Sequence, residues 1–281
     1  MGGQRIRNPL GVMQGRLLPK YKGHYQAHPV GYWSEEFPIA ADLGLDCIEF
    51  ILDFNEIGLN PLLNKDGRQR IRDCVRDTGV QVLSICADYF MKFTLHHHDI
   101  EQTQDTLHLL QKLLKGANEL GVWDVVIPCV DQSSIRDNAA RERFRERLEM
   151  ILPLAERLGV NLSLETDLNP TQFGELLSQL DSPRVTVNYD IGNSVALGFD
   201  PAEELSVYGE RISDIHIKDR VRNGGPVQLG TGDADIPHFI QQLQPFGYQG
   251  PLIMQTFRDE EGITIFTEQL QWVQQILGKG V

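Results

Sequence analysis

Successive apolar segments in the second half of the chain each end in a side chain that can bind a divalent cation. A carboxylate at the end of a buried segment is costly unless it is paired or binds a cation. Two neighbouring carboxylates raise each other's pKa, and a divalent ion removes that penalty. Oxygen ligands with one imidazole suit Mn²⁺, Mg²⁺ or Co²⁺ better than a thiolate-type zinc site. The predicted ligands of one metal ion are Glu165, Asp190, His216 and Gln255.

Each of these residues also has an ordinary structural explanation. Glu165 could pair with an arginine or lysine of the barrel, and Asp190 could cap the turn that follows it. His216 could be a hydrogen-bonded core histidine, the usual role of a single histidine in an apolar segment. Their joint occurrence at the ends of successive apolar segments favours a common site.

Short apolar segments alternate with longer amphipathic ones along the whole chain. The short segments are rich in Val, Ile and Leu, which is typical of strands buried on both faces of a parallel sheet. The predicted strands are Leu10–Gln14, Cys47–Phe50, Val80–Cys86, Val125–Cys129, Asn161–Glu165, Arg184–Asp190, Ile212–Ile217 and Leu252–Thr256. The predicted helices are Glu35–Leu43, Arg68–Thr78, Ile100–Leu120, Asn138–Leu158, Thr171–Leu180, Pro201–Tyr208, Pro237–Phe246 and Gly262–Leu277.

Eight strand–helix repeats without a linker predict a single (β/α)8 TIM barrel that spans residues 1–281. No Gly-x-Gly-x-x-Gly motif follows the first strand, which argues against a doubly wound dinucleotide-binding sheet. In a barrel, the carboxyl ends of the strands form the catalytic face. The four predicted metal ligands would therefore meet at that face.

The composition limits the partners and the compartment. The formal net charge of −13 argues against nucleic acid as a partner, because phosphate neutralisation requires Lys and Arg. No apolar run is long enough for a membrane span. Met1–Asn8 lack the apolar core of a signal peptide. The four cysteines form no C-x-x-C pair and are typical of buried free thiols, which predicts a cytoplasmic protein.

Basic and aromatic residues near the predicted strand ends are candidates for substrate binding. Arginine binds phosphate or carboxylate groups in a bidentate manner, although these side chains could also balance nearby acids. An aromatic residue in the first loop could form a pocket wall or could simply pack. The candidates are Gln14, Trp33, Lys218, Arg220 and Arg258.

Several motifs resemble the xylose isomerase-like TIM barrel superfamily of sugar and sugar-phosphate isomerases and epimerases. They are LSLETD (162–167), VNYDIGNS (187–194), DIHIKDR (214–220), LGTGDADI (229–236) and MQTFRD (254–259). GVMQGRL (11–17) and CIEF (47–50) extend the resemblance over nearly the whole chain. Members of this superfamily include D-tagatose 3-epimerase, L-ribulose-phosphate 3-epimerase, hydroxypyruvate isomerase and inosose dehydratase.

The resemblance implies that Glu165, Asp190 and His216 bind metal and that Glu165 is the general base. The substrate would be a small sugar or sugar phosphate that reacts through a metal-stabilised enediolate. Mn²⁺ is the expected ion, with Mg²⁺, Co²⁺ or Zn²⁺ as alternatives. The resemblance also implies that the protein forms a homo-oligomer.

One departure from the family concerns the second acid/base. Family members usually carry a glutamate where this chain has Gln255, and an amide cannot accept a proton in catalysis. This change questions two-base epimerisation but leaves one-base isomerisation feasible. Glu49 or Asp219, each at a predicted strand end, could supply the second group, or could instead form a cap or a salt bridge.

Three other functions remain open at this stage. An inosose-type dehydratase would share the metal and the Glu165 base but would expel a β-hydroxyl group. A non-catalytic sugar-binding barrel would explain Gln255 as a trace of lost activity. A metal-dependent endonuclease of the same superfamily is disfavoured by the acidic charge and by Asn193, where a further histidine would be needed.

Overall fold

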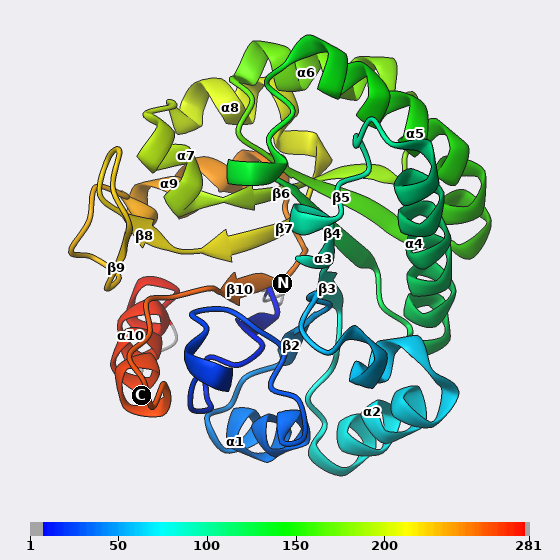
Figure 1. Cartoon of the computed structure of the whole chain (residues 1–281). Coiled ribbons are helices and arrows are strands. Elements are labelled where there is room, and N and C mark those ends of the chain that lie inside the picture. Colours follow the sequence, from blue (N-terminus) through cyan, green and yellow to red (C-terminus); the bar gives the residue numbers. More distant parts are fainter. Residues whose placement is uncertain (1–7, 279–281) are drawn as a thin grey trace, which may run out of the picture.

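In a computed structural model, eight parallel strands close into a barrel surrounded by helices (Figure 1). The structure describes residues 8–278. The strands follow one another around the barrel in the order β1-β10-β7-β6-β5-β4-β3-β2. Their bounds are β1 Leu10–Met13, β2 Cys47–Ile51, β3 Ser84–Cys86, β4 Asp124–Cys129, β5 Asn161–Thr166, β6 Val185–Asp190, β7 Ile212–Ile217 and β10 Leu252–Met254. This topology confirms the predicted (β/α)8 TIM barrel.

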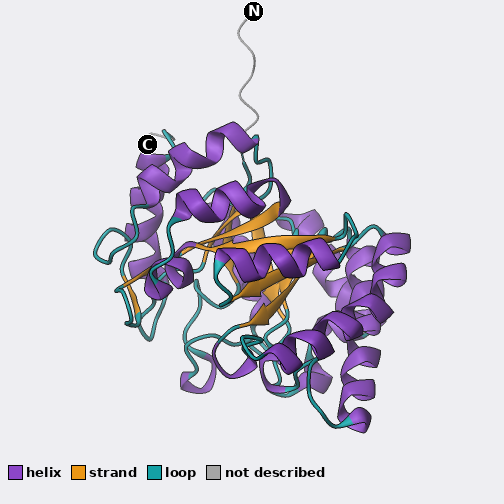
Figure 2. Ribbon diagram, turned by 90° about the horizontal axis from the view of Figure 1, so that it is seen from above, coloured by secondary structure: helices purple, strands orange, loops and turns teal. Residues whose placement is uncertain are grey.

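Helices lie outside the barrel strands in both views of the molecule (Figures 1 and 2). The predicted helices are present with small shifts at their ends: α1 Glu36–Asp42, α2 Lys65–Thr78, α4 Ile100–Leu120, α5 Asn138–Leu158, α6 Pro170–Gln179, α8 Pro201–Tyr208, α9 Ile236–Leu243 and α10 Ile263–Ile276. Glycines in the left-handed conformation follow α2, α4 and α5, where a residue without Cβ ends the helix at no steric cost. They are Gly79, Gly121 and Gly159.

Some short elements differ from the prediction. Trp33–Glu35 form a 3-10 turn, so α1 begins at Glu36 and the predicted first residue, Glu35, belongs to the turn. Helices α3 (Tyr89–Lys92) and α7 (Ile191–Leu197) follow β3 and β6 directly and are too short to show a clear apolar period in the sequence. After β7 the chain forms an antiparallel hairpin of β8 (Asp219–Arg220) and β9 (Pro226–Val227).

The inside of the barrel combines a small apolar cluster with buried polar side chains. The apolar cluster consists of Met13, Cys47, Ile51, Cys86, Val126 and Ile253. Side chains alternate between the two faces of a strand, so Glu49, which lies between Cys47 and Ile51 in this alternation, also points into the barrel. Burial of this carboxylate requires a polar partner inside, which His216 of β7 provides.

No helix among residues 8–278 is both long and apolar enough to cross a membrane. The prediction that Met1–Asn8 contain no signal peptide concerns residues that lie, except for Asn8, outside the described part of the chain.

Gly11 of β1 tests how tightly this interior is packed. A Cβ atom at this position would lie 2.5 Å from Cys47 Sγ and 2.8 Å from Ile253 Cδ1. We expect Gly11→Ala to lower the free energy of unfolding by about 1–3 kcal/mol, because overpacking forces these neighbours to move. Urea unfolding measures the change. Gly58→Ala is the matched control, since no atom lies within 4 Å of its added Cβ; equal stability of the two variants would contradict the prediction.

Candidate metal centre and active site

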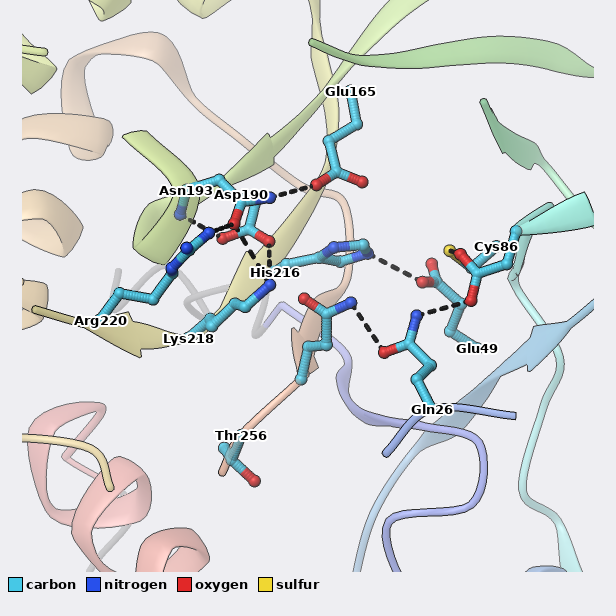
Figure 3. A network of polar contacts seen from close by, with 12 residues as sticks. Gln26, Glu49, Cys86, Glu165, Asp190, Asn193, His216, Lys218, Arg220 and Thr256 are labelled. Carbon is cyan, nitrogen blue, oxygen red and sulfur yellow. Dashed lines mark hydrogen bonds and ion pairs between the residues drawn. The ribbon is translucent and has the colours of Figure 1, made fainter. Parts of the chain in front are cut away.

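Three neighbouring strands bring together, near their carboxyl ends, three side chains of types that can bind a metal. Glu165 is the next-to-last residue of β5, Asp190 ends β6, and His216 pairs with Asp190 in the register of β6 and β7. One potential ligand atom from each of the three lies within 4.8 Å of the others. All three side chains are buried. This is the arrangement that the sequence predicted for these residues (Figure 3).

Glu165 is held by an amide rather than by a basic residue. Its Oε1 accepts a hydrogen bond from Asn193 Nδ2 at 2.6 Å. Burial and, secondly, the charge of Asp190 raise the pKa of Glu165 to about 7. A carboxyl group with a pKa close to neutral can both accept and return a proton, which is the property required of a general base.

Asp190 has two roles at once. Its Oδ1 accepts a hydrogen bond from the backbone N–H of Asn193 at 2.8 Å and thereby caps helix α7. Its Oδ2 forms an ion pair with Lys218 Nζ at 3.0 Å. The turn cap proposed as an alternative explanation is therefore present together with the metal-capable cluster.

His216 connects this cluster to a carboxylate deeper in the barrel. Its Nε2 lies 2.8 Å from Glu49 Oε1, and both side chains are fully buried. Ser84 Oγ donates to the other oxygen of Glu49 at 2.5 Å. His216 Nδ1 is buried and has no hydrogen-bond partner among residues 8–278. A buried nitrogen without a partner is costly unless it binds something that the protein itself does not provide.

Asp214 lies beside Glu49 and forms a second cluster that shares His216. Burial raises the pKa of Glu49 to about 7. Burial and the charge of Glu49 raise the pKa of Asp214 well above its usual range. Glu49 and Asp214 are both fully buried, so neither carboxylate of this second cluster is exposed to solvent.

Gln255 follows β10 and is also buried. Its Nε2 donates to Gln26 Oε1 at 3.1 Å. Its Oε1 is buried and has no partner in the described part of the chain. An amide oxygen can bind a hard cation, so this free acceptor suits the ligand role predicted for Gln255.

These donors fit a divalent cation. They comprise two carboxylates together with Gln255 Oε1 and His216 Nδ1, neither of which has a hydrogen-bond partner among residues 8–278. Such a mixture of oxygen ligands with one imidazole is typical of Mn²⁺, Mg²⁺ and related ions. The contact between Glu49 and His216 Nε2 would orient the ring of a metal-binding histidine from behind.

Two of the predicted substrate-binding cations, Lys218 and Arg220, lie beside the candidate metal ligands. Lys218 Nζ contacts Asp190 and, at 3.3 Å, Asn193 Oδ1. Arg220 Nη1 donates to the same amide oxygen at 2.8 Å, and its Nε and Nη2 donate to the carbonyl oxygen of Gly224. Both side chains stand on the Asp190 side of the site (Figure 3).

The other predicted substrate-binding residues contact other parts of the protein. Arg258 is buried and donates to the carbonyl oxygens of Gly15, Leu18, Asp259 and Glu260, so it ties the loop after β10 to the loop after β1. Trp33 is buried with its ring edge-on to Phe37 and Phe50. Gln14 Oε1 accepts from the backbone N–H of Ile51 and contacts His28 Nδ1, whereas its Nε2 has no partner among residues 8–278.

Asp219, the alternative second acid/base, is fully buried in a cradle of amides. It accepts hydrogen bonds from the backbone N–H groups of Gly230, Gly232 and Ala234. These contacts fold the LGTGDA segment onto the end of β7. The contacts of Asp219 are therefore with amides of a loop rather than with the start of a helix or with a base.

The structure adds site residues that the sequence reasoning did not identify. Asn193 links Glu165, Lys218 and Arg220, and Gln26 links Gln255 to Asp88. Asp88 follows β3 in the segment Cys86-Ala87-Asp88, so the signal used for Glu165 and Asp190 was present here too. No comparable signal exists for Gln26, which comes from a long loop.

Curated relatives of the chain are sugar-phosphate epimerases. An L-ribulose-5-phosphate 3-epimerase, UlaE, of Escherichia coli is 26% identical over 266 residues, which cover 90% of this chain and 93% of that protein. Epimerases are isomerase-class enzymes, so these relatives confirm the prediction of an isomerase-class enzyme.

Solved structures share the fold over nearly the full length. A xylose isomerase-like TIM barrel protein from Mycobacterium smegmatis in complex with magnesium has a TM-score of 0.72 and 20% identity, and the match covers 96% of this chain and 97% of that one. The IolI protein with a bound zinc atom has a TM-score of 0.75 and 16% identity, with 97% and 99% covered.

The family assignment rests on a match to most of the chain. The model that describes the xylose isomerase-like TIM barrel matches residues 37–276, which include β2 and every later barrel strand. The protein therefore belongs to the xylose isomerase-like TIM barrel family.

Proposed function

We propose that this protein is a metal-dependent sugar or sugar-phosphate isomerase or epimerase with Glu165 as its general base. The convergence of Glu165, Asp190 and His216 within 4.8 Å, with His216 Nδ1 left without a protein partner, carries the proposal. Several of the chain's own groups can then be assigned roles in removing a proton from the carbon next to a sugar carbonyl.

Glu165 takes that proton. Its pKa of about 7 in the absence of a cation reflects burial, and Asn193 keeps one of its oxygens in a fixed position. Lys218 offsets the charge of Asp190 and so limits the repulsion between Asp190 and Glu165. Water has little access to these groups, which strengthens the electrostatic interactions between them.

Glu49 is assigned a positioning role instead of the catalytic role first considered. It is fully buried on the far side of His216 and contacts Nε2 and Ser84. We infer that the Glu49 carboxylate accepts the Nε2 hydrogen, which leaves a lone pair on Nδ1 for a metal ion. Such outer contacts fix the tautomer and orientation of a ligating histidine.

A divalent cation held by Glu165, Asp190, His216 and Gln255 would polarise the substrate carbonyl and stabilise the negative charge of the enediolate. Mn²⁺ is our proposal for the native ion, since the donors are mainly oxygen atoms. The magnesium and zinc complexes among the structural neighbours support a divalent ion in this fold. We further propose a cytoplasmic homo-oligomer.

The proposed substrate is a small ketose or its phosphate ester. L-ribulose 5-phosphate is the first compound to test, since UlaE is named for it. Arg220 and Lys218 face the site. The Arg258 guanidinium instead donates its hydrogen bonds, among residues 8–278, to backbone carbonyl oxygens. We therefore assign Arg258 to loop anchoring and Arg220 to the substrate side.

A dehydratase would use the same ion and the same base. It differs in the product, because loss of a β-hydroxyl group gives an absorbing enone or dione. A non-catalytic binding barrel would not need to keep an unpartnered imidazole nitrogen and buried carboxylates, which cost free energy without a cation. The retained cluster therefore favours an enzyme.

The metal site predicts a simple loss of binding. We expect about one divalent ion per chain in the wild-type protein and none in His216→Ala, because the substitution removes one of the proposed metal ligands. Metal content by mass spectrometry after incubation with Mn²⁺ measures this. His238→Ala is the control, since this exposed residue lies on α9 away from the cluster. Equal metal content in all three proteins would disprove the site.

The base predicts a loss of proton exchange. In ²H₂O with Mn²⁺ and L-ribulose 5-phosphate, we expect Glu165→Gln to slow exchange of the α-proton at least ~100-fold, the usual contribution of a general base. Proton NMR of the sugar follows the exchange. Glu175→Gln changes an exposed glutamate of α6 and is expected to behave as wild type. Unchanged exchange in Glu165→Gln would remove this residue from the reaction.

The role of Glu49 predicts a different pattern. We expect Glu49→Gln to weaken Mn²⁺ binding about 10–100-fold, because the partner of His216 Nε2 changes. Exchange at saturating Mn²⁺ should be largely retained, since Glu49 does not touch the substrate in this proposal. Titration calorimetry and NMR separate the two quantities. Loss of exchange at saturating metal would instead return Glu49 to the catalytic group.

A further inference from the structure

A chain of hydrogen bonds leads from Gln255 to a carboxylate that the proposed function does not yet use. Gln255 Nε2 donates to Gln26 Oε1 at 3.1 Å, and Gln26 Nε2 donates to Asp88 Oδ2 at 2.7 Å. Asp88 lies just beyond β3, at the same end of the barrel as Glu165 and Asp190. Its other oxygen, Oδ1, is 3.2 Å from Cys86 Sγ.

Arg16 determines the direction of this chain. The guanidinium carries only donors, and its Nη2 donates to Gln26 Oε1 at 2.9 Å. The amide nitrogen of Gln26 must therefore face Asp88, which receives it as an acceptor. Arg16 is itself buried and held by the carbonyl oxygens of Thr256 and Tyr25.

The same argument explains the amide at position 255. Gln26 Oε1 is an acceptor that already receives Arg16, so its second partner must also be a donor. The Nε2 of Gln255 is such a donor, whereas a glutamate carboxylate there would place two acceptors against each other. The amide is thus part of an ordered network rather than the remnant of a lost group. In this network the carboxylate lies two hydrogen bonds away, at Asp88.

Asp88 shares the electrostatic surroundings of the site. Its charge contributes to raising the pKa of Glu165 and of Glu49. Burial raises the pKa of Asp88 itself, so its protonated form is favoured compared with an exposed aspartate. Gln26 and Cys86, which contact Asp88, lie on the Glu49 side of His216, away from Lys218 and Arg220 (Figure 3).

The two second acid/base candidates that the sequence suggested are less exposed than Asp88. Glu49 and Asp219 are fully buried, with Glu49 against His216 and Asp219 in its cradle of amides. Asp88 is only partly buried.

We propose that Asp88 is the second catalytic acid/base and that it transfers a proton at the face of the sugar opposite Glu165. This inference rests on the proposed function and specifies it as epimerisation. Glu165 removes the proton from the carbon next to the carbonyl, and the C–H electron pair forms the C=C bond of the enediolate. When the carbonyl forms again, that electron pair takes the Asp88 proton and makes a C–H bond of inverted configuration. Glu165 is then protonated and Asp88 ionised, and exchange with solvent or the reverse reaction restores both.

Asp88→Asn separates the two proton transfers. In ²H₂O with Mn²⁺ and L-ribulose 5-phosphate, we expect this variant to bind Mn²⁺ as wild type and to exchange the α-proton through Glu165. Epimerisation should fall at least ~100-fold, because the amide cannot deliver a proton. Proton NMR measures exchange and epimer formation in one sample. A residue that only supports the fold would reduce both together.

Two variants control this experiment. Asp88→Glu keeps a carboxyl group and should restore part of the epimerisation. Asp124→Asn removes a buried carboxylate at the opposite end of the barrel, where β4 begins, and should keep both exchange and epimerisation.

The outcomes distinguish this inference from the proposed function. Epimerisation by Asp88→Asn at the wild-type rate would overturn the role of Asp88 while leaving the enzyme itself in place. Loss of both exchange and epimerisation in a variant that still binds Mn²⁺ would also overturn it and assign Asp88 to substrate binding. Absence of metal, exchange and epimerisation in the wild-type protein would refute the proposed function and, with it, this inference.

Discussion

Repulsion between buried carboxyl groups at one end of the barrel is the constraint on which the rest of the site depends. Glu165 and Asp190 are brought within a few ångströms of each other by adjacent strands, and each is largely removed from water. Lys218 and Asn193 reduce this repulsion from one side. The unpartnered nitrogen of His216 remains on the other, where a cation would complete the balance of charge.

This constraint extends into the barrel. Glu49 and Asp214 are fully buried, and Glu49 contacts the imidazole that faces the metal ligands. Such an interior is costly for a protein that needs only a stable core, since apolar side chains would fill the space at no electrostatic cost. The polar interior is therefore best understood as support for the orientation of His216.

The loop after β1 organises the opposite side of the site. Arg16 is buried there and, by donating to Gln26, sets the orientation of two amides and one carboxylate in sequence. Arg258 ties the same loop to the segment after β10. Gln255 is consequently one part of a hydrogen-bond network, and its role cannot be judged from position 255 alone.

The sequence by itself determined the barrel and placed together the candidate metal-binding residues. Strand and helix periods are local properties, and the left-handed glycines after α2, α4 and α5 mark the ends of helices directly. Because carboxyl ends of parallel strands share one edge, Glu165, Asp190 and His216 could be placed together before any coordinates were known.

Only the tertiary structure decided what surrounds them. Trp33 and Arg258 are buried, Glu49 contacts His216, and hydrogen bonds lead from Arg16 to Asp88. These contacts join segments that are far apart in sequence. Side-chain hydrogen bonds of this kind depend on loop conformation and on the direction of each amide, and neither property leaves a periodic pattern in the sequence. For this reason the sequence brought together residues of the types that can bind a metal, while the structure decided which of the remaining polar groups contact other parts of the protein.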